Sequence, residues 1–175
     1  NIELNNFTSK NSAHSGSTIT IQYGEFINVN NVVSKDNTGT TGRGFEFIEC
    51  SQSRFENITA KNNTGVGVFF DGAYISEVEK VHSFDNTLDG ISVDGTVAES
   101  PLEFSNCISF GNGGDGIELA GSTNIILSDS QFQENDTEGI DVHGSRCIIK
   151  NCVASNNDSD GINLGNLGDN AMISH

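Results

Sequence analysis

The chain has 175 residues, a length that suits a single domain, and a formal net charge of −16. So acidic a chain is repelled by nucleic acid and by anionic membrane surfaces, and no apolar run approaches the ~20 residues that span a bilayer. We therefore expect neither nucleic acid nor a membrane as partner. Hydrophobic residues make up only 34%, but they recur at fixed positions, which argues against disorder.

The first 38 residues carry irregular copies of a pattern that later becomes regular. Residues 19–21 and 26–29 alternate apolar and polar side chains as strands do. From residue 31 onward, each copy predicts two or three strands of three to five residues, separated by polar turns. No shift in composition marks a boundary, so we predict one domain over residues 1–175. Neither end shows the polar cap that a repeat array needs, which favours a fragment of a longer chain or an oligomer such as a homotrimer.

One glycine marks every copy, followed directly by an apolar residue and by a second one two positions later. These glycines stand at positions 44, 67, 90, 116, 139 and 161, so the copies recur every 22 to 26 residues. A period of this length is typical of repeat architectures. Because apolar and polar residues also alternate within each copy, each copy should form one coil that stacks on the next. We predict an all-β parallel β-helix, a solenoid of about six to seven coils with ~23-residue repeats.

Two further columns are expected to be structural. An asparagine four residues before the glycine occurs at positions 63, 86, 112, 135 and 157, with Asn37 in the first copy. An inward asparagine at a turn can bond to the backbone and to the next asparagine, and it tolerates left-handed φ. The glycine should mark a bend without room for a Cβ atom. The cysteines Cys50, Cys107, Cys147 and Cys152 are expected to be buried free thiols. Cys107 and Cys152 share a column but lie two coils apart, too far for a disulfide.

The segments Ser83–Ile91 and Ser109–Ile117 share a Ser-Phe-x-Asn-x-x-Asp-Gly-Ile pattern. This pattern resembles right-handed parallel β-helix proteins, among them pectate lyases, mannuronan C5-epimerases, periplasmic copper-assembly proteins and phage tailspikes. The resemblance covers nearly the whole chain and implies right-handed winding. The segment Gly139–Gly144 is similar to the Gly-Phe-Asp-Pro-His-Glu motif of alginate epimerases, and matches it at the glycine, the aspartate and the histidine. It departs at the proline and at the final acid, and the family's Tyr and Arg-His partners are replaced by Glu138 and by Ser159-Asp160.

Acidic residues recur directly before the glycine and two positions after it, where we expect them to face solvent. Asp115, Glu118, Glu138 and Asp141 should then cluster across two adjacent coils. Carboxylates at such short distances repel one another unless they are neutralised. Ca²⁺ can neutralise them, because it accepts many oxygen ligands in loose geometry. We predict these four residues as Ca²⁺ ligands, and Asp89 and Asp160 as substrate-binding residues. The alternative is a solvated acidic face with one carboxylate protonated or rotated away.

His143 and Asp141 are the predicted catalytic residues. A neutral histidine at pH 7 can act as a general base; the alternative is an ordinary exposed side chain. Two function classes follow. The first is a carbohydrate-active protein that acts on an acidic polysaccharide, as a Ca²⁺-assisted lyase or C5-epimerase. The second is a non-catalytic module of a viral tailspike, adhesin or surface fibre, which the scarcity of Lys and Arg favours. Both classes imply an extracellular, cell-surface or virion-associated protein.

Overall fold

The computed structural model describes residues 2–13, 16–95, 101–165 and 171–174, and these form strands joined by turns, with no helix among them. The strands are β1 (Ile2–Lys10), β2 (Ile19–Gln22), β3 (Ile27–Lys35), β4 (Phe45–Ile48), β5 (Arg54–Lys61), β6 (Val68–Asp71), β7 (Ser76–Phe84), β8 (Ile91–Asp94), β9 (Leu102–Ser105), β10 (Ile108–Phe110), β11 (Ile117–Thr123), β12 (Ile125–Ser128), β13 (Gln131–Gln133), β14 (Ile140–Ser145), β15 (Ile148–Lys150), β16 (Val153–Ser155), β17 (Ile162–Leu164) and β18 (Met172–Ser174). Within this part of the chain, no helix is long and apolar enough to cross a bilayer.

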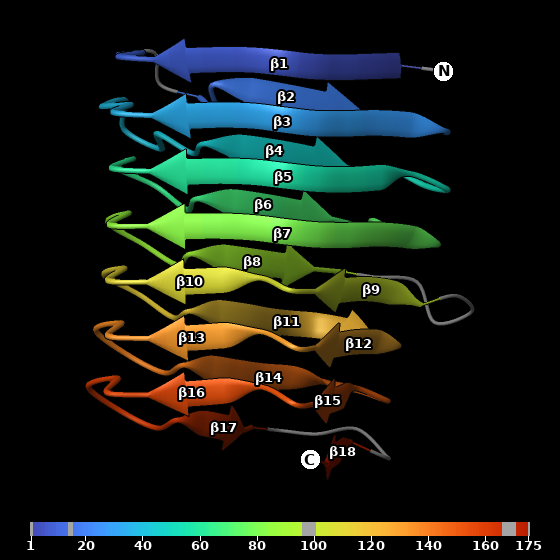
Figure 1. Ribbon diagram of the computed structural model, residues 1–175, viewed down its shortest axis with the longest axis vertical. Helices are drawn as coiled ribbons and strands as arrows, with labels where there is room; N and C mark the ends of the chain where they lie inside the picture. Colours follow the sequence, from blue (N-terminus) through green and yellow to red (C-terminus); the bar gives the residue numbers. More distant parts are fainter. Residues whose placement is uncertain (1, 14–15, 96–100, 166–170, 175) are drawn as a thin grey trace.

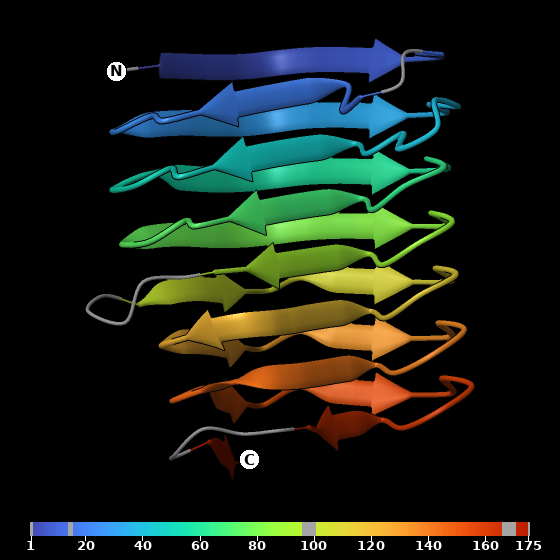
Figure 2. The same ribbon diagram turned by 180° about the vertical axis from the view of Figure 1, so that it is seen from behind.

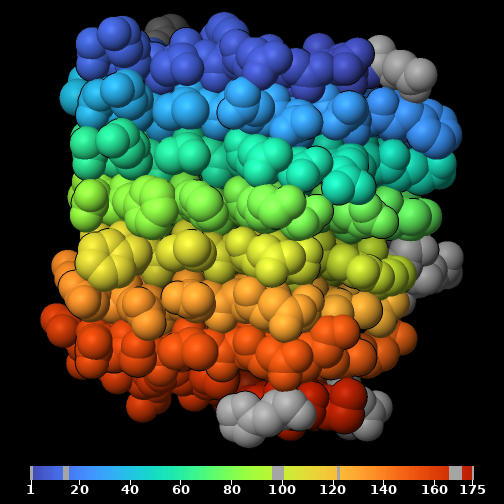
Figure 3. All heavy atoms as spheres, viewed as in Figure 1, coloured from blue at the N-terminus to red at the C-terminus, as the bar shows by residue number. Residues whose placement is uncertain are grey.

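The strands build two parallel sheets that face each other across a narrow core (Figure 1). The 7-stranded sheet runs in the order β17-β14-β11-β8-β6-β4-β2, one strand from each coil (Figure 2). The 11-stranded sheet covers the other side. Its early coils contribute one long strand, such as β5 or β7, and its later coils contribute two short ones, such as β9 and β10. Figure 3 shows its outer face as a wall of stacked bands, one coil to a band. The seven coils confirm the predicted parallel β-helix.

The core is filled by the inward columns that the sequence places in register. Ile91, Ile117 and Ile140 stack directly on one another, and all three are fully buried. Phenylalanines fill the core beside this column: the Phe47 and Phe70 ring centroids lie 5.2 Å apart, and those of Phe70 and Phe104, on opposite sheets, lie 5.5 Å apart. Because like side chains repeat coil after coil, each coil offers the next one a matching apolar surface.

The predicted asparagine ladder is present and includes Asn37. At each step the side-chain amide Nδ2 donates to the Oδ1 of the asparagine in the next coil, and that Oδ1 also accepts the backbone N–H. Asn86 donates both bonds to Asn112 in this way, each at 3.0 Å. The expectation of left-handed φ is wrong for the ladder asparagines themselves. The residue that precedes each of them adopts the positive φ instead. These preceding residues are Asp36, Asn62, Asp85, Gly111, Glu134 and Asn156.

The four cysteines are free thiols, as predicted. Cys50, Cys107 and Cys147 are buried, and Cys152 is partly covered. Burial raises the pKa of Cys107 to about 12, so its nucleophilic thiolate form is suppressed. These side chains fill space in the core in the manner of small hydrophobic residues.

Candidate functional site

The candidate residues lie on or beside the outer face of the 7-stranded sheet (Figure 2). Strand pairing places Ser92, Glu118, Asp141 and Asn163 in one column across β8, β11, β14 and β17. A second column, at the turn before each strand, contains Asp89, Asp115, Glu138 and Asp160. The structure therefore brings the predicted acidic site residues into two neighbouring columns, because the repeat fixes their register. His143 lies in a third column, where it pairs with Ala120.

These side chains are less exposed than the sequence pattern suggests. Asp115 and Asp141 are each only 8% exposed, Asp89, Glu118 and Glu138 are half-buried, and Asp160 is exposed. The expectation that both columns face solvent is wrong for Asp115 and Asp141. An outward side chain in the middle of a stack is covered by the coils on either side of it, which the alternation of inward and outward positions does not reveal.

The column before the glycine holds adjacent coils together. Asp89 Oδ1 accepts a hydrogen bond from the backbone N–H of Asp115 at 2.9 Å, and Asp115 Oδ1 accepts one from the N–H of Glu138 at 3.0 Å. Thr137 also donates its hydroxyl to Asp115, and Ser159 Oγ donates to Glu138 Oε1 at 2.9 Å. Each carboxylate thus binds a backbone or side-chain donor one coil further along.

Two of these acids, Asp115 and Glu138, have pKa values that are shifted in opposite directions. Desolvation, with smaller contributions from a side-chain hydrogen bond to Glu138 and from the charge of Asp89, raises the pKa of Asp115 from an ordinary value of 3.8 to about 7, although hydrogen bonds from Thr137 and from the Glu138 backbone lower it. The hydrogen bonds that Glu138 accepts from Ser159 and from Asp115 lower its own pKa. Below about pH 7, Asp115 is therefore mostly protonated while Glu138 carries the charge. Protonation of one member relieves the repulsion that would otherwise call for a cation.

Asp115→Asn is expected to increase stability at high pH but not at low pH. The folded-state pKa lies above the unfolded one, so the contribution of the protonated acid is complete below 3.8 and is lost as the pH rises to about 7. Asparagine keeps the acceptor for Thr137 and Glu138 without the charge. Urea unfolding should show a gain on the order of 2 kcal/mol at about pH 8 and little change at about pH 4. An equal change at both pH values, or a gain of the same size in Asp160→Asn at the exposed end of the column, would contradict this assignment.

The four predicted Ca²⁺ ligands do not form a coordination set in this arrangement. Among the residues that the structure describes, no group of three or more His, Cys, Asp or Glu side chains could hold a metal ion. Glu118 Oε2 accepts a hydrogen bond from Ser92 at 3.1 Å, and Asp141 is held by Asn163. Ca²⁺ binding stays a prediction from the sequence.

Asp141 and His143 form a pair on β14. The two residues are two positions apart on one strand, so both side chains project from the same face. His143 Nε2 lies 2.8 Å from Asp141 Oδ2, and Asn163 Nδ2 donates to the other oxygen, Oδ1, at 3.0 Å. The side chain of His143 is 44% exposed and that of Asp141 only 11%. A covered carboxylate thus holds an accessible imidazole in place.

Two residues that support this pair were not singled out from the sequence. Asn163 lies one coil beyond Asp141 in the same column, and the fixed register of the repeat could have identified it. Gly165 leaves room for the histidine ring, since a Cβ atom there would lie 2.4 Å from His143 Nδ1. The Nδ1 atom makes no hydrogen bond with the described part of the chain. Gly165 therefore packs beside the ring edge that carries Nδ1.

A family model described as "Right handed beta helix region" matches residues 1–147 and 89–175. Among solved structures, a point mutant of the periplasmic alginate epimerase AlgG has a TM-score of 0.74 at 15% identity, and the unmutated AlgG has a TM-score of 0.67 at 16% identity. Each match covers 98% of this chain and 47% of that chain, so the chain spans about half the length of these structures. No curated protein sequence matches significantly.

The structural likeness, at such low identity, concerns the fold alone. The two matches to the family model overlap and together extend from the first residue to the last. The right-handed winding implied by the sequence resemblance is thereby confirmed, and the chain belongs to the right-handed β-helix family.

Proposed function

We propose that this protein acts on an acidic polysaccharide and removes the C5 proton of a uronic acid residue, as a polysaccharide lyase or a C5-epimerase. The observation that carries the proposal is the Asp141–His143 pair, in which a covered carboxylate orients an accessible imidazole. The fold of the periplasmic alginate epimerase supports it by analogy. On the same ground we propose that the protein works outside the cytoplasm.

The chemistry requires one base and a way to bear negative charge. His143, with neutral imidazole, would take the proton from C5, and the electron pair left behind would delocalise into the adjacent carboxyl group. Return of a proton to the opposite face gives the epimer, whereas loss of the O4 substituent gives an unsaturated sugar. Asp141 would stabilise the imidazolium that forms and Asn163 would keep Asp141 in position, a division of roles familiar from other His–Asp pairs. Asp89 and Asp160 remain our candidates for contact with substrate hydroxyl groups.

His143→Gln is expected to lower turnover of whichever polyuronate the wild type acts on by about a hundredfold or more. The variant should unfold at the same temperature as the wild type. Polymannuronate, polyguluronate and polygalacturonate would be assayed for unsaturated ends by ultraviolet absorbance and for epimers by proton NMR, each with added Ca²⁺ and with a chelator. His82→Gln is the matched control, because His82 lies on the 11-stranded sheet. Full activity in His143→Gln, or equal loss in both variants, would overturn the assignment of the base. Activity that the chelator does not change would remove Ca²⁺ from the proposal.

The second candidate is a non-catalytic module of a surface fibre, tailspike or adhesin. It is favoured by the hydrogen bonds of Asp89, Asp115 and Glu138, which give these acids a role in stacking the coils. It is also favoured by the position of Arg43, which pairs with Glu46 and covers the Phe69 ring at 4.0 Å, far along the stack from His143. A stable trimer in sedimentation equilibrium, together with no turnover of any polyuronate, would favour this candidate over the enzyme.

A further inference from the structure

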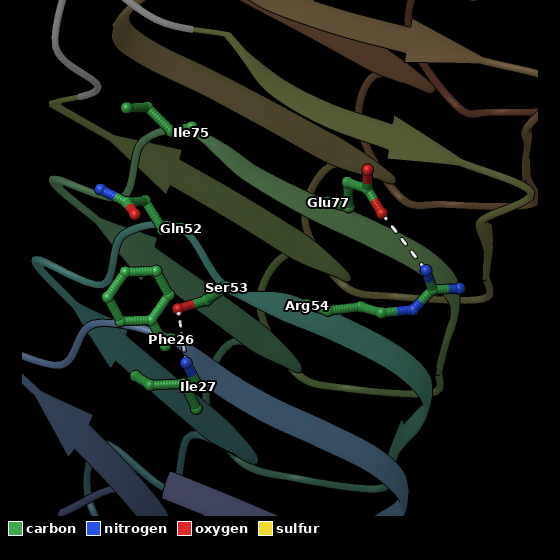
Figure 4. Close-up of a pocket in the computed structure, with 7 residues that line it drawn as sticks. All are labelled: Phe26, Ile27, Gln52, Ser53, Arg54, Ile75 and Glu77. Carbon is green, nitrogen blue, oxygen red and sulfur yellow. Dashed lines mark hydrogen bonds and ion pairs between the residues drawn. The ribbon is translucent and has the colours of Figure 1, made fainter. Parts of the chain in front are cut away.

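A groove at one corner of the solenoid has no part in the proposed chemistry. It lies where the chain turns from the 7-stranded sheet into the 11-stranded sheet, and its cavity has a volume of about 420 Å³ (Figure 4). The pocket is lined by Phe26, Ile27, Gln52, Ser53, Arg54, Ile75 and Glu77. A smaller hollow of about 140 Å³ continues it along the stack and shares Ile75 and Glu77. The two hollows form one groove parallel to the solenoid axis.

The groove has an apolar edge and a polar edge. Successive coils place Phe26, Gln52 and Ile75 in one row, and Pro101 extends that row into the second hollow. Arg54, Glu77 and Glu103 form the opposite row, because they are paired in register on β5, β7 and β9. Figure 4 shows Phe26, Gln52 and Ile75 on one side and the Arg54–Glu77 pair on the other. At ~4.8 Å per coil, four coils give a length of roughly 15 Å.

The apolar edge is made of residues that the fold itself disfavours. Phe26 and Ile75 have φ angles of 54° and 46°, in the left-handed region that is unfavourable for bulky and β-branched side chains. Their side chains gain little from burial, since Phe26 is 54% exposed and Ile75 is 45% exposed. Elsewhere in the chain asparagine is the commonest residue at left-handed φ, as at Asn124 in the same column. Exposed apolar side chains in strained positions point to a role in binding.

The polar edge determines the charge of a suitable ligand. Arg54 donates to the carboxylates of Glu56, Glu77 and Glu79 at 3.2 to 3.3 Å. Lys80 also pairs with Glu56 and Glu79, so two cations face three carboxylates and the cluster is net negative. Glu103 adds another carboxylate beside the groove. A polyanion would be repelled here. The carboxylates, the Gln52 amide and the remaining N–H groups of Arg54 are instead suited to hydrogen bonds with hydroxyl groups.

We propose that this groove binds a neutral glycan chain that lies along the solenoid axis. The C–H faces of successive pyranose rings would pack on Phe26 and Ile75, and their hydroxyl groups would bond to Gln52, Arg54 and Glu77. The site is independent of the proposed chemistry, because Asp141 and His143 lie on the outer face of the 7-stranded sheet.

The test exploits the strain at the apolar edge. Phe26→Asn and Ile75→Asn remove the apolar contacts and introduce a residue that tolerates left-handed φ. Both variants should therefore fold and melt at or above the wild-type temperature. The probes are neutral hexasaccharides of glucose, mannose, xylose and N-acetylglucosamine, with hexagalacturonate for comparison. Binding is measured by isothermal titration calorimetry and by NMR shifts. Leu88→Asn, which replaces an exposed apolar side chain in a distant turn, is the matched control.

We expect at least one neutral hexasaccharide to bind the wild type, and each groove variant to bind it about tenfold more weakly, with Leu88→Asn unchanged. Hexagalacturonate should bind more weakly than the neutral sugar. The proposal is overturned if no neutral probe binds, if Phe26→Asn and Ile75→Asn bind as the wild type does, or if hexagalacturonate binds best. A wild-type dimer that Phe26→Asn dissociates in sedimentation would assign the groove to a second copy of the chain, and would overturn it as well.

Discussion

Replacement of Gly116 by alanine is expected to destabilise the protein by about 3 kcal/mol. A Cβ atom there would lie 2.5 Å from the carbonyl oxygen of Gly139, 2.8 Å from Asn135 Nδ2 and 3.0 Å from Phe132 Cβ. None of these atoms belongs to a flexible side-chain end, so the spacing between two coils would have to open. The backbone at Gly116 has no positive φ, and the cost therefore comes from crowding and not from loss of conformational freedom.

The same column supplies the control for this prediction. At Gly161 the nearest atom to an added Cβ would be the Ala154 carbonyl oxygen at 3.4 Å, an ordinary contact. Gly161→Ala should change the free energy of unfolding by less than about 0.5 kcal/mol in urea titrations. Equal destabilisation by the two substitutions would mean that close approach of the coils is not the reason for glycine at this position.

Asn112→Ala is expected to destabilise the protein by about 3 kcal/mol. The side chain is fully buried and donates to Asn135 Oδ1 at 3.0 Å and to Ser109 Oγ at 2.9 Å. Its own Oδ1 accepts the backbone N–H and the amide of Asn86. Alanine would leave the backbone N–H of Asn86 without an acceptor inside the stack, where water cannot replace the lost bond, although Asn86 Nδ2 keeps Ser83 Oγ and the Ala60 carbonyl oxygen as acceptors.

Asn157→Ala provides the comparison for the ladder. Asn157 is half-buried and is the last asparagine whose Oδ1 accepts a ladder bond, from Asn135 at 3.0 Å, in the described part of the chain. Water can reach the groups that its loss exposes, so the cost should be about half that of Asn112→Ala in the same urea titrations. An equal or larger cost for Asn157→Ala would show that burial of the ladder does not set its energetic contribution.

The fold could be predicted from the sequence because each coil repeats the same physical requirements. The glycine period, the asparagine column and the inward rows such as Ile91, Ile117 and Ile140 all specify one coil stacked on another. A one-residue slip would turn every apolar side chain outward, so the register is fixed as well. The alternation of side chains along β14 places Asp141 and His143 on one face.

The environment of the outward residues could not be predicted in the same way. Asp115 precedes its strand, so alternation does not apply to it, and its cover comes from neighbouring coils. Whether carboxylates converge on an ion or donate and accept bonds along the stack depends on side-chain rotamers, which sequence spacing does not specify. The left-handed corners at Phe26 and Ile75 were also missed, because bulky apolar residues ordinarily avoid that conformation.

The proposal that His143 is a C5 base is tested most directly by release of tritium into water from a polyuronate that carries tritium at C5. Either reaction, epimerisation or elimination, begins with removal of this hydrogen, so the measurement does not depend on the product. We expect tritium to be released by the wild type and by His82→Gln, and not by His143→Gln. Release that persists in His143→Gln, or that is absent from the wild type with every polyuronate, would contradict the assignment of Asp141 and His143 as the catalytic pair.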